Sequence, residues 1–69
     1  MWKWILECTM VDDDLEEHIK TIERTDWDKT LETFVNMVKH PDCTTIKVTC
    51  YLGGVPYPTN DPVVLEFRA

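Results

Sequence analysis

Three stretches of this chain alternate apolar and polar residues at every second position, and one stretch between them repeats its apolar residues every three to four positions. The alternating stretches are residues 3–10, 44–52 and 63–68, and the helical one is 27–39. Alternation gives a strand two different faces, whereas the longer period gives a helix one apolar face. This pattern limits the fold to a half-buried sheet covered by one amphipathic helix.

Each alternating stretch places most of its apolar side chains on one face, which we expect to be buried against the helix. Ile5 is an exception, because it follows the polar phase of its stretch. The predicted inner face contains Trp4, Leu6, Cys8, Met10, Ile46, Val48, Cys50, Leu52, Val63, Leu65 and Phe67. The predicted outer face contains Lys3, Ile5, Glu7, Thr9, Thr45, Lys47, Thr49, Tyr51, Val64, Glu66 and Arg68.

Residues 18–25 fit two structures. Leu15, Ile19 and Ile22 lie on one face if the segment is helical, and an aspartate before them would cap that helix. However, Ile19, Ile22, Thr21 and Thr25 are β-branched, which favours a strand. We therefore predict a strand that forms a hairpin with residues 3–10 through an acidic turn at 11–17, and a helix is the alternative.

The helical stretch is the clearest element of the sequence. Its apolar stripe contains Trp27, Leu31, Phe34, Val35 and Val38. Thr25 or Asp26 is the expected N-cap, and Pro41 is expected to end the helix after Lys39.

A glycine- and proline-rich segment separates the last two alternating stretches. Gly53 and Gly54 end residues 44–52, and three prolines within 55–62 predict that this segment has no regular strand pairing. Pro56 and Pro58 hold Tyr57 in an extended segment, which would display the aromatic ring to a partner. A plain connecting loop is the alternative interpretation.

Together these elements predict an α+β fold in a single domain over residues 1–69. The predicted order is ββαββ, with a mostly antiparallel four-stranded sheet and one amphipathic helix packed on one of its faces. The strand order is left open, and side-by-side first and last strands are one option.

Negative charge is concentrated in one half of the sequence. Ten of the thirteen acidic residues lie within residues 1–32, where four basic residues accompany them, and the remainder of the chain is neutral. A lopsided negative field repels nucleic acid and anionic membrane, and it attracts a basic surface. We therefore expect a protein partner with a basic surface, with no direct binding to nucleic acid or membrane.

The residues expected to contact such a partner are the acidic turn, the acids of the first helical turns, and the displayed tyrosine. They are Asp12, Asp13, Asp14, Glu16, Glu17, Asp26, Asp28, Glu32 and Tyr57.

No metal site, cofactor or catalytic residue is predicted. The acidic run imitates a calcium-binding loop, but Glu17 stands where that loop needs glycine. His40 and Cys43 lie close in sequence in a predicted exposed loop, but no Cys-x-x-Cys pair accompanies them. The chain has no serine, and no third group is evident that would orient a cysteine–histidine pair.

Size and cysteine content bear on the oligomeric state of the protein and on its compartment. A domain of 69 residues buries a modest core, so self-association into a homodimer is a further expectation. Its three cysteines are an odd number at wide spacing, which favours free thiols, two of them (Cys8 and Cys50) buried on strands. With no secretory signal or long apolar run, we expect a soluble cytoplasmic protein.

The sequence thus favours a non-enzymatic protein-binding module. Its size, charge and lack of catalytic motifs resemble those of small acidic phage proteins that block host machinery, some of which occupy basic grooves that hold nucleic acid. That resemblance implies an inhibitor, such as an anti-defence protein. The alternatives are a structural or homodimeric subunit whose acidity serves solubility, and a dimer that sequesters a small ligand.

Overall fold

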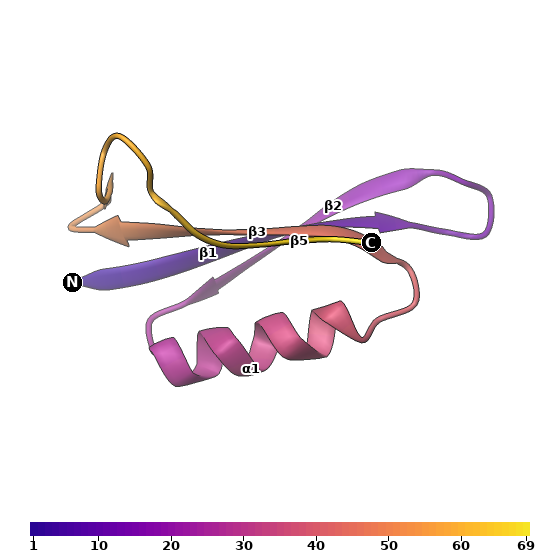
Figure 1. The fold of residues 1–69 in the computed structure, drawn as a ribbon, viewed down its shortest axis with the longest axis horizontal. Coiled ribbons are helices and arrows are strands. Elements are labelled where there is room, and N and C mark those ends of the chain that lie inside the picture. Colours follow the sequence, from indigo (N-terminus) through magenta and orange to yellow (C-terminus); the bar gives the residue numbers. More distant parts are fainter.

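The computed structural model describes all 69 residues and consists of an antiparallel sheet with one helix (Figure 1). The elements in chain order are β1 (Trp2–Val11), β2 (Glu17–Arg24), α1 (Trp27–Val38), β3 (Cys43–Leu52), β4 (Val55–Pro56) and β5 (Val63–Arg68). The predicted α+β class is confirmed. The observed order is ββαβββ in place of the predicted ββαββ, because a fifth, two-residue strand is present.

The two longest strands, β1 and β3, pair with each other at the centre of the sheet. β2 pairs with the other side of β1, and both β4 and β5 pair with the far side of β3. The first and last strands are therefore not neighbours, so the side-by-side option does not occur. α1 connects the edge strand β2 to β3 and covers one face of the sheet (Figure 1). This helix is too short and too polar to cross a membrane.

The ambiguous segment after the acidic turn is a strand, as predicted. β2 pairs with β1 from Trp4 opposite Arg24 to Val11 opposite Glu17. Its β-branched residues suit an extended backbone, and the neighbouring strand supplies the hydrogen-bond partners that an isolated segment lacks.

The proline-rich segment contains the strand that the sequence analysis missed. Gly53 and Gly54 have φ of +62° and +83°, which are the angles of a two-residue hairpin turn, and Leu52 lies opposite Val55 across it. Pro56 lies opposite Tyr51, and the Tyr57 N–H then donates to the Cys50 carbonyl at 3.0 Å. Pro56 occupies a position where no ladder N–H is needed, so proline is compatible with this pairing.

The core lies between the helix and the middle of the β1–β3 pair. Its buried apolar residues are Leu6, Cys8, Met37, Cys43, Ile46 and Val48. Cys50 is also buried, so both strand cysteines are buried free thiols as predicted. Cys43 was expected in an exposed loop, but it begins β3 and is buried. Burial raises the pKa of all three thiols, which keeps them protonated at neutral pH.

The buried face of α1 differs from the predicted stripe. Thr30 and Met37 are its buried residues, whereas Val35 remains 46% exposed. The Thr30 hydroxyl donates to the Asp26 carbonyl at 2.8 Å, so this polar side chain is satisfied inside the core. The prediction is correct for Leu31, Phe34 and Val38, which are half-buried, and it is wrong for Val35. Periodicity of apolar residues could not identify the buried position of Thr30, because that position depends on where the helix axis lies over the sheet.

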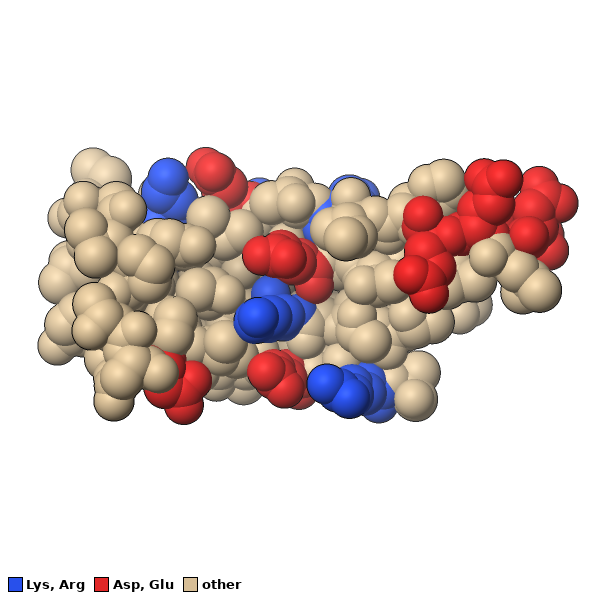
Figure 2. Space-filling model, turned by 90° about the horizontal axis from the view of Figure 1, so that it is seen from above, with Lys and Arg blue, Asp and Glu red and all other residues tan.

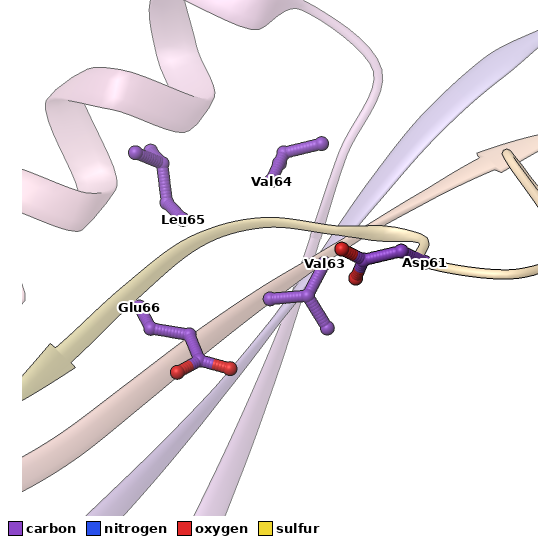
Figure 3. A pocket seen from close by; sticks show the side chains of 5 residues that line it. All are labelled: Asp61, Val63, Val64, Leu65 and Glu66. Carbon is purple, nitrogen blue, oxygen red and sulfur yellow. The ribbon is translucent and has the colours of Figure 1, made fainter.

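A β-bulge in β5 changes its faces. The register shifts between Val48 and Thr49, so that Val63 lies opposite Thr49 while Leu65 lies opposite Val48. Val64 is the extra residue, and its side chain points to the helix side together with Leu65 (Figure 3). The sequence prediction placed Val63 on the inner face and Val64 on the outer one, and the bulge reverses both.

Candidate partner-binding surface

The acidic turn forms one tip of an elongated molecule whose backbone measures 39 × 23 × 16 Å. We name residues 12–17, which join β1 to β2, the acidic tip. Figure 2 shows acidic side chains gathered at that end of the molecule, while the opposite end carries few charges. The five carboxylates that were predicted here, those of Asp12, Asp13, Asp14, Glu16 and Glu17, do lie together.

Asp12 organises the acidic tip. Its Oδ1 accepts hydrogen bonds from the backbone N–H groups of Asp14 at 2.9 Å and Glu16 at 3.0 Å. Its Oδ2 lies 3.1 Å from His18 Nε2. Backbone bonds from Asp12 N–H to the Glu16 carbonyl and from Leu15 N–H to the Asp12 carbonyl close the turn. The tip is therefore held in a defined shape by one aspartate.

The hydrogen bonds to Asp12 make the tip sensitive to acid. Chiefly the Glu16 N–H, and then His18, lower the pKa of the Asp12 carboxyl below its ordinary value of 3.8. A folded-state pKa below the unfolded value means that this stabilisation is complete above pH 3.8 and is lost as the pH falls through the folded pKa.

We expect the Glu16 amide to exchange faster with solvent as the pH falls below 3.8, once the intrinsic pH dependence of exchange is corrected for. The Asp12→Asn variant keeps a side-chain acceptor but does not titrate, so the corrected protection of this amide should not vary with pH. An equal loss of protection in both proteins would contradict the role of Asp12.

The other four carboxylates of the acidic tip form no ion pair. The ion pairs of the molecule are Lys3–Glu23, His18–Asp12 and Lys29–Glu32, so no lysine or arginine neutralises the tip. Asp13, Asp14, Glu16 and Glu17 are all exposed. Their charge is therefore available to a partner, and their mutual repulsion opposes folding rather than supporting it.

A leucine stands among these acids. Leu15 is 82% exposed, and its φ of +63° lies in the left-handed region. Residues other than Gly, Asn and Asp seldom adopt this backbone conformation. Ile19, on the adjoining part of β2, is 70% exposed. The tip thus combines unpaired negative charge with a protruding apolar side chain. The sequence analysis placed Leu15 in the acidic turn at 11–17 but did not include it among the expected contact residues.

Asp12, Glu16 and His18 each offer one ligand atom, and these atoms lie within 4.8 Å of one another. Hydrogen bonding within the turn accounts for this closeness, since the Asp12 carboxylate already contacts two backbone N–H groups and the His18 ring.

The helix acids lie apart from the acidic tip. They adjoin the other end of β2, and eight extended residues of that strand separate the two groups by roughly 23 Å. Asp26 is the N-cap and accepts from the Asp28 N–H at 2.8 Å, and Glu32 lies 3.9 Å from Lys29. Asp28 and Glu32 are exposed. Asp26 serves the helix N-terminus, so the nine predicted contact residues do not form one continuous surface.

Tyr57 belongs to a row of aromatic rings at the end of the molecule opposite the acidic tip. Its ring meets the Trp2 ring edge-on, with 5.4 Å between the ring centroids. The Trp2 ring stacks on that of Trp4 with a centroid distance of 6.3 Å, and the Trp4 and Trp27 centroids are 5.5 Å apart. Trp2 is 44% exposed. The alternation of Trp2 and Trp4 in the sequence signals this row, because alternate residues of a strand share a face.

The cysteine–histidine pair considered in the sequence is not assembled. The Cys43 thiol is buried and donates to the Thr45 carbonyl at 3.6 Å, whereas His40 is exposed and its Nδ1 accepts from the Asp42 N–H at 3.2 Å. Each side chain therefore has a local hydrogen-bond partner, and neither contacts the other.

Two open hollows mark the surface, and both adjoin β5. The larger, of about 310 Å³, is lined by Asp61, Val63, Val64, Leu65 and Glu66 (Figure 3). The second lies between β3 and the end of β5. No protein-family model, curated protein or solved structure matches this chain.

Proposed function

We propose that this protein is a non-enzymatic binding module whose acidic tip docks on a basic surface of a partner protein. The observation that carries the proposal is the composition of the tip, where four unpaired carboxylates surround an exposed leucine in a turn that Asp12 holds in shape. Such a surface supplies long-range attraction through charge and short-range contact through Leu15.

Leu15 supports this proposal because its position costs the protein stability. A left-handed backbone at a leucine is unfavourable by roughly 1 kcal/mol, and the exposed side chain gains nothing by burial within its own chain. Strain of this kind is typical of residues that are kept for contact with a ligand.

A cationic recess fits the acidic tip best. The tip is a narrow turn at the end of a long hairpin (Figure 1), and grooves that hold a nucleic acid backbone are concave and lined by lysine and arginine. Our proposal is therefore an inhibitor that occupies such a groove, as anti-defence proteins of phages do. In a cytoplasmic setting, the partner would be a nucleic-acid-binding protein.

Replacing Leu15 by glycine should separate stability from binding. Glycine adopts positive φ without strain, so the free energy of unfolding should stay constant or rise by up to about 1 kcal/mol. Loss of the side chain should weaken partner binding, and urea unfolding together with calorimetric titration measures both. A variant that binds as tightly as the wild type would exclude Leu15 from the contact.

The decisive experiment captures the partner from the tip itself. A photo-crosslinking amino acid at Leu15 should become covalently attached to a protein with a basic surface, and the same amino acid at Asn60, in the exposed loop before β5, should not. Competition by a short duplex DNA or RNA would identify the groove as a nucleic-acid site. Equal capture from both positions, or capture that persists when the tip carboxylates are neutralised, would refute the proposal.

A further inference from the structure

The outer edge of β5 is unpaired and lies apart from the acidic tip. β5 pairs with β3 on one side only, and the larger hollow follows its other side (Figure 3). Charges that point toward the covered face are one of the features that protect a sheet edge from pairing with another chain. β2, the opposite edge, has such charges, because His18, Lys20 and Arg24 share the helix side with Ile22. β5 instead presents Leu65, Phe67 and the bulged Val64 there.

We propose that a second copy of this chain pairs with β5, in antiparallel orientation about a two-fold axis at Phe67. This register sets Phe67 opposite Phe67 of the second copy. It also sets Glu66 opposite Arg68 of the second copy and Arg68 opposite its Glu66, so that two ion pairs form across the new junction.

The charges of β5 favour this arrangement. Glu66 and Arg68 are both exposed, and neither forms an ion pair within the protomer. Glu66 lies opposite Lys47 on β3, while Arg68 lies opposite the uncharged Thr45. Pairing of two copies places each Glu66 between Lys47 and Arg68 of the second copy, in an alternating row of charges on the outer face.

The backbone favours the same register. The Ala69 N–H donates to the Thr44 carbonyl at 2.8 Å, so residue 69 directs its backbone groups toward β3. Because this direction alternates along a strand, Glu66 and Arg68 direct their N–H and carbonyl groups to the open edge. A two-fold axis at Phe67 brings these two residues opposite each other, and four backbone hydrogen bonds result.

The neighbouring registers fail. An axis at Glu66 or at Arg68 would set two like charges directly opposite each other. An axis at Leu65 would place the bulged Val64, on the helix side, opposite Glu66 on the outer side. The bulge therefore confines the pairing to the part of β5 that is centred on Phe67.

Two charge-reversal variants test the junction. Glu66→Arg and Arg68→Glu each set like charges opposite one another in a homodimer, so each should raise the dimer dissociation constant at least about tenfold in sedimentation experiments. An equimolar mixture of the two variants should regain wild-type affinity as a heterodimer, because every Arg then faces a Glu. A wild-type protein that remains monomeric at millimolar concentration, variants that dimerise like the wild type, or a mixture that stays monomeric would each overturn the proposal.

Hydrogen exchange provides a test that needs no substitution. The amides of Glu66 and Arg68 should exchange rapidly in dilute wild-type protein and become protected as its concentration rises, whereas exposed amides of the acidic tip should not change. Protection that appears on β2 or on the aromatic row, with none on Glu66 and Arg68, would place the self-contact elsewhere and overturn the proposal.

Discussion

Replacing Ile46 by alanine should leave a large fraction of the protein unfolded at room temperature. Ile46 is 1% exposed, and it lies on β3 between β1 and β5, where Cys8 and Phe67 are its cross-strand neighbours. Truncation of a buried isoleucine costs about 2–5 kcal/mol through lost burial and the cavity left behind. A core in a domain of this size rarely supplies more than about 3–5 kcal/mol of net stability. The loss is thus comparable to the whole free energy of unfolding.

Ile19→Ala is the matched control for that prediction. It is the same substitution on another strand, at a side chain that is 70% exposed, so the free energy of unfolding should change by less than about 0.5 kcal/mol. Urea titration followed by tryptophan fluorescence measures both variants. Comparable destabilisation by the two substitutions would show that the core does not lie between α1 and the β1–β3 pair.

Neutralising the acidic tip should slow association with the partner by about tenfold or more at low salt, because charge steers the encounter of the two surfaces. The change converts four exposed carboxylates to amides: Asp13→Asn, Asp14→Asn, Glu16→Gln and Glu17→Gln. Asp12 is kept, since it holds the turn. Removal of repulsion within the tip should leave stability equal or higher, and stopped-flow kinetics with the partner captured through Leu15 gives the rate.

A control with the same net charge separates steering by the tip from attraction by the whole molecule. It neutralises four exposed acids elsewhere: Glu7→Gln, Glu23→Gln, Glu32→Gln and Asp61→Asn. The association rate of this control should fall much less, because steering depends on charge near the contact. Equal slowing of both proteins would mean that net charge, and not the acidic tip, governs the encounter.

Much of the fold follows from sequence periodicity. The alternation of β1 and β3, the helical period of α1 and the β-branched residues of β2 give four elements within one or two residues of their observed bounds. The details that differ depend on partners distant in the sequence. β4 requires Tyr51 and Leu52 across a glycine turn, and the bulge at Val64 requires the register of β3. Neither feature produces a repeating pattern of apolar residues that the sequence would reveal.

The candidate surface was predictable only in part. Consecutive acids in a turn must share a location, so the acidic tip could be defined from sequence alone. Asp26, Asp28 and Glu32 lie far from the tip because β2, which separates them from it, is an extended strand. A helix of the same eight residues would span less than half the length of the strand. The exposure of Leu15 and the aromatic row of Trp2, Trp4, Trp27 and Tyr57 emerge only once the strands are paired.

The salt dependence of wild-type association with the captured partner tests the central claim most directly. Raising the ionic strength from about 0.01 M to about 1 M shortens the Debye length from about 30 Å to about 3 Å, which removes steering by the acidic tip. We predict an association rate that falls steeply over this range, together with a dissociation rate that changes little. An association rate that stays constant across the range would contradict the claim that the carboxylates of the tip guide this protein to its partner.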